Sequence, residues 1–144
     1  PKRLPRDKVC DAVIEYFGLY PTLCDLSGLP QPSKTALVDL PGAPPRPDAS
    51  SFAYLVKDPS AMGPDAAFAE FALRSEMPRY MIRTERYKFI FNHGGTHELY
   101  DHERDPGEYV NRADDPQYKT RFRGLRDQLF AWYYPGDNPF RKKT

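Results

Sequence analysis

The chain has 144 residues, of which 40% are hydrophobic and 14% aromatic, so it can enclose a core and is not a disordered tail. Its 21 Lys and Arg residues balance its 20 Asp and Glu residues, which gives no electrostatic support for a nucleic-acid or acidic-membrane partner. No apolar run approaches the roughly 20 residues that span a bilayer, so we expect neither nucleic acid nor membrane as a partner.

The first 30 residues predict a strand followed by a short helix. Residues 9–17 mix β-branched and aromatic side chains, which favours a strand. Residues 19–28 favour a helix with Pro21 in its first turn and Gly28 at its end. Cys24 lies within this helical pattern and is expected to be a buried free thiol, the alternative being a disulfide with Cys10. Three leucines share one face that needs a partner surface: Leu19, Leu23 and Leu26.

Residues 31–50 are rich in proline and predict an extended surface loop. Proline removes the backbone donor that a helix or sheet interior requires. Residues 51–56 then predict a brief helix, with Ser50 or Ser51 as its N-cap.

Three consecutive segments have the alternation and turn residues of strands: residues 79–84, 87–92 and 97–101. Tight turns at residues 83–86 and 93–96 join them, which predicts an antiparallel meander. Residues 67–73 fit either a helix or a strand by composition and are a plausible fourth strand.

The last element predicted is a long helix that begins at Asp115 and Pro116 and ends near residue 134. Apolar residues recur at spacings of three and four: Tyr118, Phe122, Leu125, Leu129 and Trp132 or Tyr133. This stripe should cover one face of the sheet. The predicted fold class is therefore α+β, a small antiparallel sheet of three to four strands covered by a C-terminal helix.

The acidic stretch from residue 101 to residue 108 carries four carboxylates at the short spacings that calcium favours. The register of a calcium loop starting at Asp101 fails, because Pro106 and Arg112 occupy the sixth and twelfth positions. We predict instead that Asp105, Pro106 and Gly107 form a turn and that no metal binds. Four side chains should cap backbone donors: Asp101, Asp105, Glu108 and Asn111.

His93 and His97 are the candidate substrate-binding residues. Their spacing matches helical zinc ligands, but Gly94 and Gly95 favour a hairpin loop, so we predict no metal site. Such a loop can present donors to an anion, and the alternative is a solvated loop tip. The sequence has no G-x-S-x-G, no glycine-rich phosphate loop and no C-x-P-x-R, so no catalytic residue is assigned.

Four segments together resemble, in order, the C-terminal part of sulfatases of the alkaline-phosphatase superfamily: residues 19–30, 51–59, 80–90 and 98–111. The last of these is similar to the family signature "ELYD…DPxExxN". His102 resembles the "LYDH" variant of iduronate-2-sulfatase-like and related bacterial enzymes, alongside arylsulfatase-like ones. Two positions depart from the family pattern: Gly18 stands where an aspartate is usual, and Arg112 with Ala113 replaces the usual residues after the signature.

The resemblance implies a domain plan and a set of partners. Residues 1–30 would be the last strand and helix of a large catalytic domain, residues 31–50 a loop, and residues 51–144 the C-terminal α+β subdomain. The full-length family uses calcium and a formylglycine, and neither is expected to be bound by this segment. The implied partners are the N-terminal catalytic domain of the same protein and a sulfated small molecule or glycan. Because the chain starts at Pro1, we expect it to be a piece of a longer protein. The family resemblance implies a periplasmic, secreted or lysosome-like location.

Three functional hypotheses follow. The main one is the C-terminal subdomain of a sulfuric ester hydrolase, inactive alone, which braces the catalytic domain and borders the substrate cleft through the loop at His93 and His97. The second is the same subdomain of a phosphodiesterase or phosphonate hydrolase, since the fold does not distinguish sulfur from phosphorus. The third is a free-standing module that binds a sulfated glycan or a protein.

Overall fold

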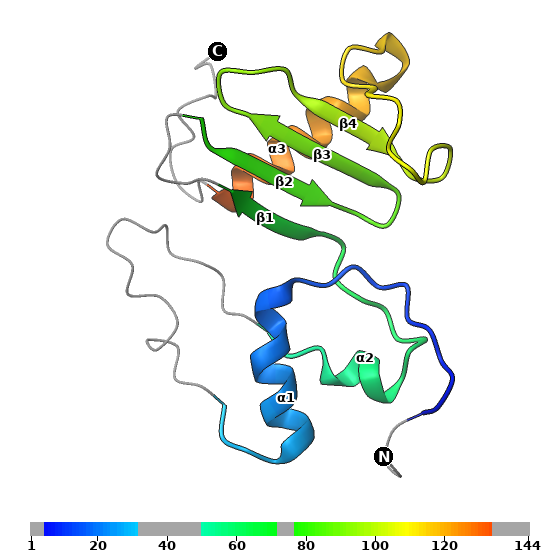
Figure 1. The fold of residues 1–144 in the computed structure, drawn as a ribbon, viewed down its shortest axis with the longest axis vertical. Helices are drawn as coiled ribbons and strands as arrows, with labels where there is room; N and C mark the ends of the chain where they lie inside the picture. Colours follow the sequence, from blue (N-terminus) through cyan, green and yellow to red (C-terminus); the bar gives the residue numbers. More distant parts are fainter. Residues whose placement is uncertain (1–4, 32–49, 72–76, 134–144) are drawn as a thin grey trace. The chain divides into compact units, whose positions relative to one another are not determined.

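The computed structural model describes residues 5–31, 50–71 and 77–133. The chain forms two compact units, Pro1–Asp65 and Ala66–Thr144 (Figure 1). The described part of the first unit contains helices and no strand, and that of the second packs a helix on an antiparallel sheet. The predicted α+β class is confirmed.

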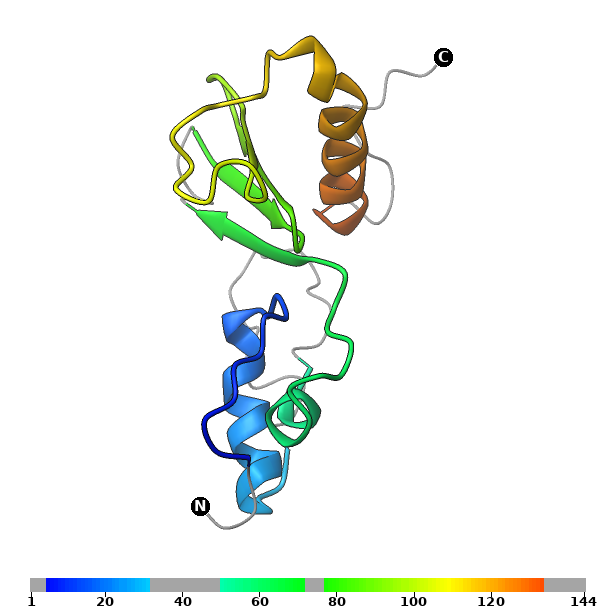
Figure 2. The same cartoon turned by 90° about the vertical axis from the view of Figure 1, so that its right-hand side faces the viewer.

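The first unit contains a 3₁₀ turn, η1 (Tyr16–Gly18), and two helices, α1 (Leu19–Ser27) and α2 (Ala53–Lys57). α1 and α2 lie side by side in Figures 1 and 2. Gly28 ends α1 in the left-handed conformation, with φ of 71°, as the sequence predicted. Cys24 is buried and free, which also confirms its prediction.

One buried threonine connects the two helical segments. The hydroxyl of Thr22 donates to the carbonyl of Gly18 at 2.6 Å and accepts from the amide of Phe52 at 2.9 Å. A Cβ at Gly18 would lie 2.6 Å from the carbonyl oxygen of Ser50, closer than real contacts allow. The close approach of residues 50–52 therefore explains the glycine that departs from the family pattern.

Two predictions for the first unit need correction. The strand predicted over residues 9–17 is wrong, because residues 8–15 have no regular structure and pair with no described strand. The N-cap of α2 is Phe52, although the hydroxyl of Ser51 still accepts from the amide of Ala53 at 3.2 Å. The two compact units divide after Asp65, and α2 lies beside α1 in the first of them. The predicted assignment of residues 1–30 to a catalytic domain and of residues 51–144 to a C-terminal subdomain stays a prediction. The loop prediction for residues 31–50 lies almost wholly outside the described residues.

The second unit contains a four-stranded antiparallel sheet in the order β1-β2-β3-β4. Its strands are β1 (Ala67–Phe71), β2 (Arg79–Arg83), β3 (Tyr87–Asn92) and β4 (Glu98–Asp101). Neighbours in sequence are neighbours in the sheet, so the predicted meander is confirmed together with its fourth strand.

One face of this sheet is covered by α3 (Lys119–Tyr133), as Figure 2 shows. The helix follows a 3₁₀ turn, η3 (Pro116–Tyr118), whose N-cap Asp115 accepts from the amide of Gln117 at 2.9 Å. The core between sheet and helix consists of Tyr80, Ile82, Phe89, Leu99, Tyr118, Leu125 and Leu129. The predicted cap and apolar stripe are confirmed. Among the described residues, no helix has the length and apolar character needed to cross a membrane.

Candidate functional site

Asp101 is the structural centre of the acidic stretch. It is 1% exposed and accepts two hydrogen bonds from Arg86, Nε to Oδ1 at 2.9 Å and Nη2 to Oδ2 at 2.8 Å. The hydroxyl of Tyr118 donates to Oδ2 at 3.0 Å. These bonds, above all those from Arg86, hold the pKa of Asp101 below its usual value. The carboxylate therefore joins the end of β4 to the loop before β3 and to the start of the C-terminal helix.

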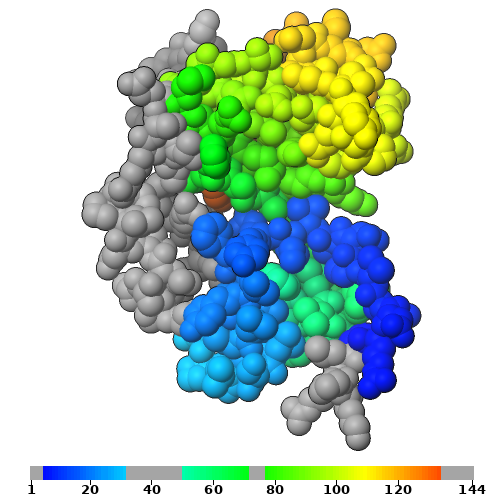
Figure 3. Space-filling model, viewed as in Figure 1, coloured from blue at the N-terminus to red at the C-terminus, as the bar shows by residue number. Residues whose placement is uncertain are grey.

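The rest of the stretch forms a compact bulge beside β4, yellow in Figure 3. Asp105 accepts from the amide of Val110 at 2.8 Å, and its carbonyl closes the predicted turn by accepting from the amide of Glu108 at 3.2 Å. Asn111 Oδ1 accepts from the amides of Leu99 at 3.0 Å and Ala113 at 2.9 Å. Backbone capping by Asp105 and Asn111 is thus confirmed, and Asp101 also accepts from the amide of Glu103 at 3.3 Å.

Glu108 does not follow the capping prediction. Its carboxylate lies beside two cationic or ionisable side chains, 2.6 Å from Nζ of Lys88 and 2.9 Å from Nε2 of His102. The contact with His102 lacks the alignment of a hydrogen bond, so it acts as an ion pair only when the imidazole is protonated. Within the described ranges, no three His, Cys, Asp or Glu side chains are grouped so that they could hold a metal ion.

The two candidate histidines occupy different environments. His93 is exposed in the turn after β3, where Gly94 adopts φ of 72°, which agrees with the predicted hairpin. His97 is partly buried and stacks on Phe91, with ring centroids 4.5 Å apart. Its Nδ1 is buried and has no hydrogen-bond partner among the described residues. His97 is thus part of the aromatic packing, whereas His93 is at the surface.

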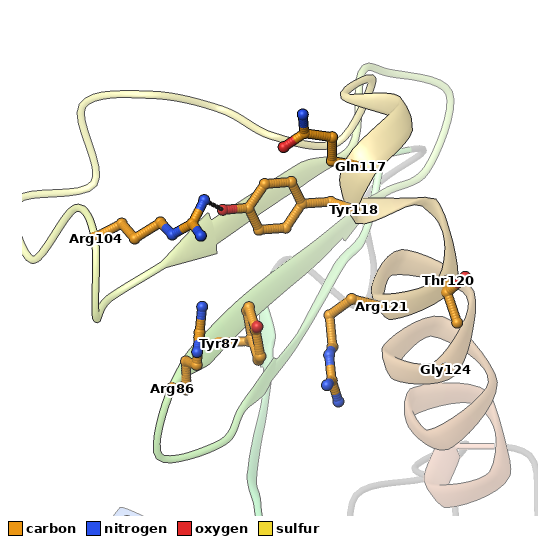
Figure 4. A pocket seen from close by; sticks show the side chains of 8 residues that line it. All are labelled: Arg86, Tyr87, Arg104, Gln117, Tyr118, Thr120, Arg121 and Gly124. Atoms are coloured by element: carbon orange, nitrogen blue, oxygen red, sulfur yellow. Dashed lines mark hydrogen bonds between the residues drawn. The ribbon is translucent and has the colours of Figure 1, made fainter.

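A pocket of about 530 Å³ lies where the loop before β3, the loop after β4 and the start of the C-terminal helix meet (Figure 4). We call it the arginine pocket; it is lined by Arg86, Tyr87, Arg104, Gln117, Tyr118, Thr120, Arg121 and Gly124. Arg104 points towards the hydroxyl of Tyr118, and Arg86, Tyr87 and Arg121 surround the space below that ring in this view. Sequence reasoning missed this site, because no short motif links residues that only the fold brings together.

The model of the family "N-sulphoglucosamine sulphohydrolase, C-terminal" matches residues 1–133. The chain belongs to this family. The resemblance to sulfatases is therefore confirmed, and the chain is a sulfatase C-terminal domain.

Three relatives illustrate the similarity. A Delta 4,5-hexuronate-2-O-sulfatase of Bacteroides thetaiotaomicron is 35% identical over 104 residues, which cover 71% of this chain and 20% of the relative. The solved structure of a 2-O GAG sulfatase is 30% identical with a TM-score of 0.55, covering 76% of this chain and 22% of that one. The phosphonate monoester hydrolase of Agrobacterium radiobacter is 25% identical with a TM-score of 0.55, covering 80% and 24%. The chain spans about a fifth of the length of the curated relatives it matches.

Acid is expected to destabilise this sulfatase domain through His97. Burial lowers its pKa below the usual 6.5, the nearby Arg126 lowers it further, and Asp114 opposes them. The unfolded chain therefore takes up the proton first, so the stabilising effect of a neutral His97 is full above about pH 6.5 and is lost as the pH falls below it. Urea unfolding between pH 7.5 and pH 5 measures this loss, and His97→Phe should flatten the dependence.

The matched control is His93→Gln, which alters an exposed imidazole and should leave the contribution of His97 in place. An unchanged pH dependence in His97→Phe would contradict the assignment to His97.

Proposed function

We propose that this chain is the C-terminal subdomain of a sulfuric ester hydrolase that acts on a sulfated sugar, and that it braces the catalytic domain and borders the substrate cleft. The observation that carries the proposal is the family match over residues 1–133 in a chain that spans about a fifth of its curated relatives. The relatives named for 2-O-sulfated uronate and for GAG support a sulfated sugar as the substrate class.

The bracing role is supported by an exposed apolar face on the first unit. Tyr20 is 55% exposed and Leu23 52%, three residues apart on one face of α1, and Tyr16 in the preceding 3₁₀ turn is 85% exposed. Of the predicted leucine face, Leu19 and Leu26 are partly buried, so the exposed face is centred on the two tyrosines and Leu23. Clustered exposed apolar side chains are typical of a surface that another domain covers.

His93 is the residue that we propose as a contact at the border of the cleft. It is exposed in a glycine-containing turn, from which it can donate to an anionic substrate. His97 would support this turn from the aromatic cluster below. Calcium and formylglycine belong to the catalytic domain in this proposal, since the sequence has no C/S-x-P-x-R and the described residues offer no grouped metal ligands. No step of the reaction is assigned to this chain.

A second candidate is the same subdomain in a phosphonate monoester hydrolase. The similarity to the enzyme of Agrobacterium radiobacter supports this second candidate. Its sequence identity to this chain is 25%, close to the 30% of the 2-O GAG sulfatase. A substrate panel separates the two candidates.

The test compares the 144-residue chain with a longer polypeptide that carries it at its C-terminal end. We expect no turnover of 4-nitrophenyl sulfate or of a 2-O-sulfated unsaturated uronate disaccharide by the chain alone, and sulfate release by the longer polypeptide. Preferred hydrolysis of a phenylphosphonate monoester would favour the second candidate. Turnover of either sulfate ester by the 144-residue chain would overturn the proposal.

The same longer polypeptide tests the bracing role. Leu23→Asp places a charge on the exposed face of α1 and should lower the melting temperature and the yield of active enzyme, because burying an unpaired charge is costly. Val110→Asp, at an exposed position of the second unit, is the control. Equal behaviour of the two variants would exclude this face as the bracing surface.

A further inference from the structure

We propose that the arginine pocket binds an oxyanion, the sulfate ester of a sulfated sugar. None of its eight lining residues is acidic, and three of them are arginines. Guanidinium groups form bidentate, charge-assisted hydrogen bonds with planar and tetrahedral oxyanions. The residues that line the pocket therefore favour a negatively charged ligand.

Two of the three arginines have no acidic partner among the residues that the structure describes. Arg86 is engaged by the buried Asp101 at 2.8 Å and also pairs with Glu103. Arg104 and Arg121 form no ion pair with any carboxylate among the described residues, and both are exposed. An anion entering the pocket would meet two guanidinium groups that have no carboxylate partner in the part of the chain that the structure describes.

Both of these arginines contact a tyrosine that lines the pocket. The Cζ of Arg121 lies 4.7 Å from the centroid of Tyr87, and Arg86 lies over the same ring at 5.0 Å. Nη1 of Arg104 is 3.5 Å from the hydroxyl of Tyr118, which is itself buried and bonded to Asp101. Side chains that are already positioned lose less conformational entropy on binding. The pocket is thus partly preorganised for an anion.

Gly124 is a second, independent observation. Glycine inside a helix is destabilising relative to alanine, and packing often explains why one is present. Here a Cβ added at Gly124 would have no heavy atom within 4 Å, so packing does not require the glycine. The open space over it belongs to the pocket, where a missing side chain leaves room for a ligand.

The size of the pocket favours an anion on a larger molecule over a single ion. A volume of about 530 Å³ lies within the range of roughly 300–1,000 Å³ for small-molecule sites. The side chains of Gln117 and Thr120 are exposed, bond to no other described side chain and can serve sugar hydroxyls. The choice of a sugar rests on the proposed function, whereas oxyanion binding rests on the pocket alone.

The test is calorimetric titration of the full chain at low salt, without any hydrolysis readout. The probes are a 2-O-sulfated uronate disaccharide, the same disaccharide without sulfate, and inorganic sulfate. We expect the sulfated disaccharide to bind more tightly than either of the other two, and its affinity to fall as salt is raised. Arg121→Gln should weaken it by about tenfold or more, because a charge-assisted bond is lost.

Two matched comparisons make the result specific. Arg123→Gln removes the same charge from an exposed position of α3 outside the pocket and should leave the affinity unchanged. Gly124→Met fills the pocket and should abolish binding while raising the unfolding midpoint, which separates lost binding from lost folding. Equal loss in Arg121→Gln and Arg123→Gln, or intact binding in Gly124→Met, would overturn the proposal.

The probes also distinguish the sources of the anion. Equal affinity for inorganic sulfate and the sulfated disaccharide would overturn the sugar component, and no binding of either would overturn the site. Because hydrolysis is not measured, failure here is independent of whether the longer polypeptide releases sulfate.

Discussion

Replacing Phe89 with alanine is expected to lower the free energy of unfolding by about 3–5 kcal/mol, because it removes buried apolar atoms and leaves a cavity. Phe89 is 0% exposed at the centre of the core. It pairs with Ile82 and Leu99 on the neighbouring strands and meets Phe122 of α3 edge to face, with ring centroids 5.0 Å apart.

Urea unfolding followed by tryptophan fluorescence measures the effect. Trp132 is the single tryptophan of the chain and stacks on Phe68 of β1, with ring centroids 4.6 Å apart, so its emission reports the docking of α3 on the sheet. The matched control is Phe71→Ala, in which the side chain is 69% exposed and the expected change is within about 0.5 kcal/mol. Equal effects of the two substitutions would contradict the assigned core.

Replacing Asp101 with asparagine is expected to lower the free energy of unfolding by about 2–4 kcal/mol at pH 7, because it breaks a buried, hydrogen-bonded ion pair. The amide keeps the shape of the side chain but cannot accept all the donors from Arg86 and Tyr118. The partial exposure of Arg86 limits the loss to less than that of a fully buried pair.

The control for Asp101 is Asp127→Asn. Asp127 pairs with Arg126 at 2.8 Å but is 64% exposed, so its expected effect is within about 0.5 kcal/mol.

The dependence of stability on acid is a second measurement of the role of Asp101. The folded-state pKa of Asp101 is lowered from 3.8, so its stabilising contribution is present above about pH 4 and is lost as the pH falls through the lower folded value. Asp101→Asn should remove that loss of stability in acid. If the variant loses as much stability in acid as the unmodified chain does, other carboxylates cause the loss.

Elements with local signals were predictable from the sequence. The turn residues at Gly94 and Gly95 and the alternation in β3 define a hairpin without reference to distant residues. Asp115 and Pro116 likewise define where the last helix begins. In each case the physical cause lies within a few residues of the structure it produces.

Features that depend on distant partners were not predictable in the same way. Residues 9–17 have strand composition, but a strand requires a neighbour with which to hydrogen-bond, and the described residues provide none. Glu108 was expected to cap a turn, yet its carboxylate forms an ion pair with Lys88 of β3. The arginine pocket draws on three segments of chain, so composition near any one of its residues carries no signal.

The hydrogen bonds to Asp101 limit how the second unit can open. A single carboxylate is shared by the loop before β3, the end of β4 and the residue that precedes α3. The helix therefore cannot lift from the sheet at this end without releasing Tyr118 and leaving a buried acceptor short of a donor. Fluctuations that free the start of the helix are coupled to fluctuations that free the hairpin, so these distant segments belong to one cooperative unfolding unit.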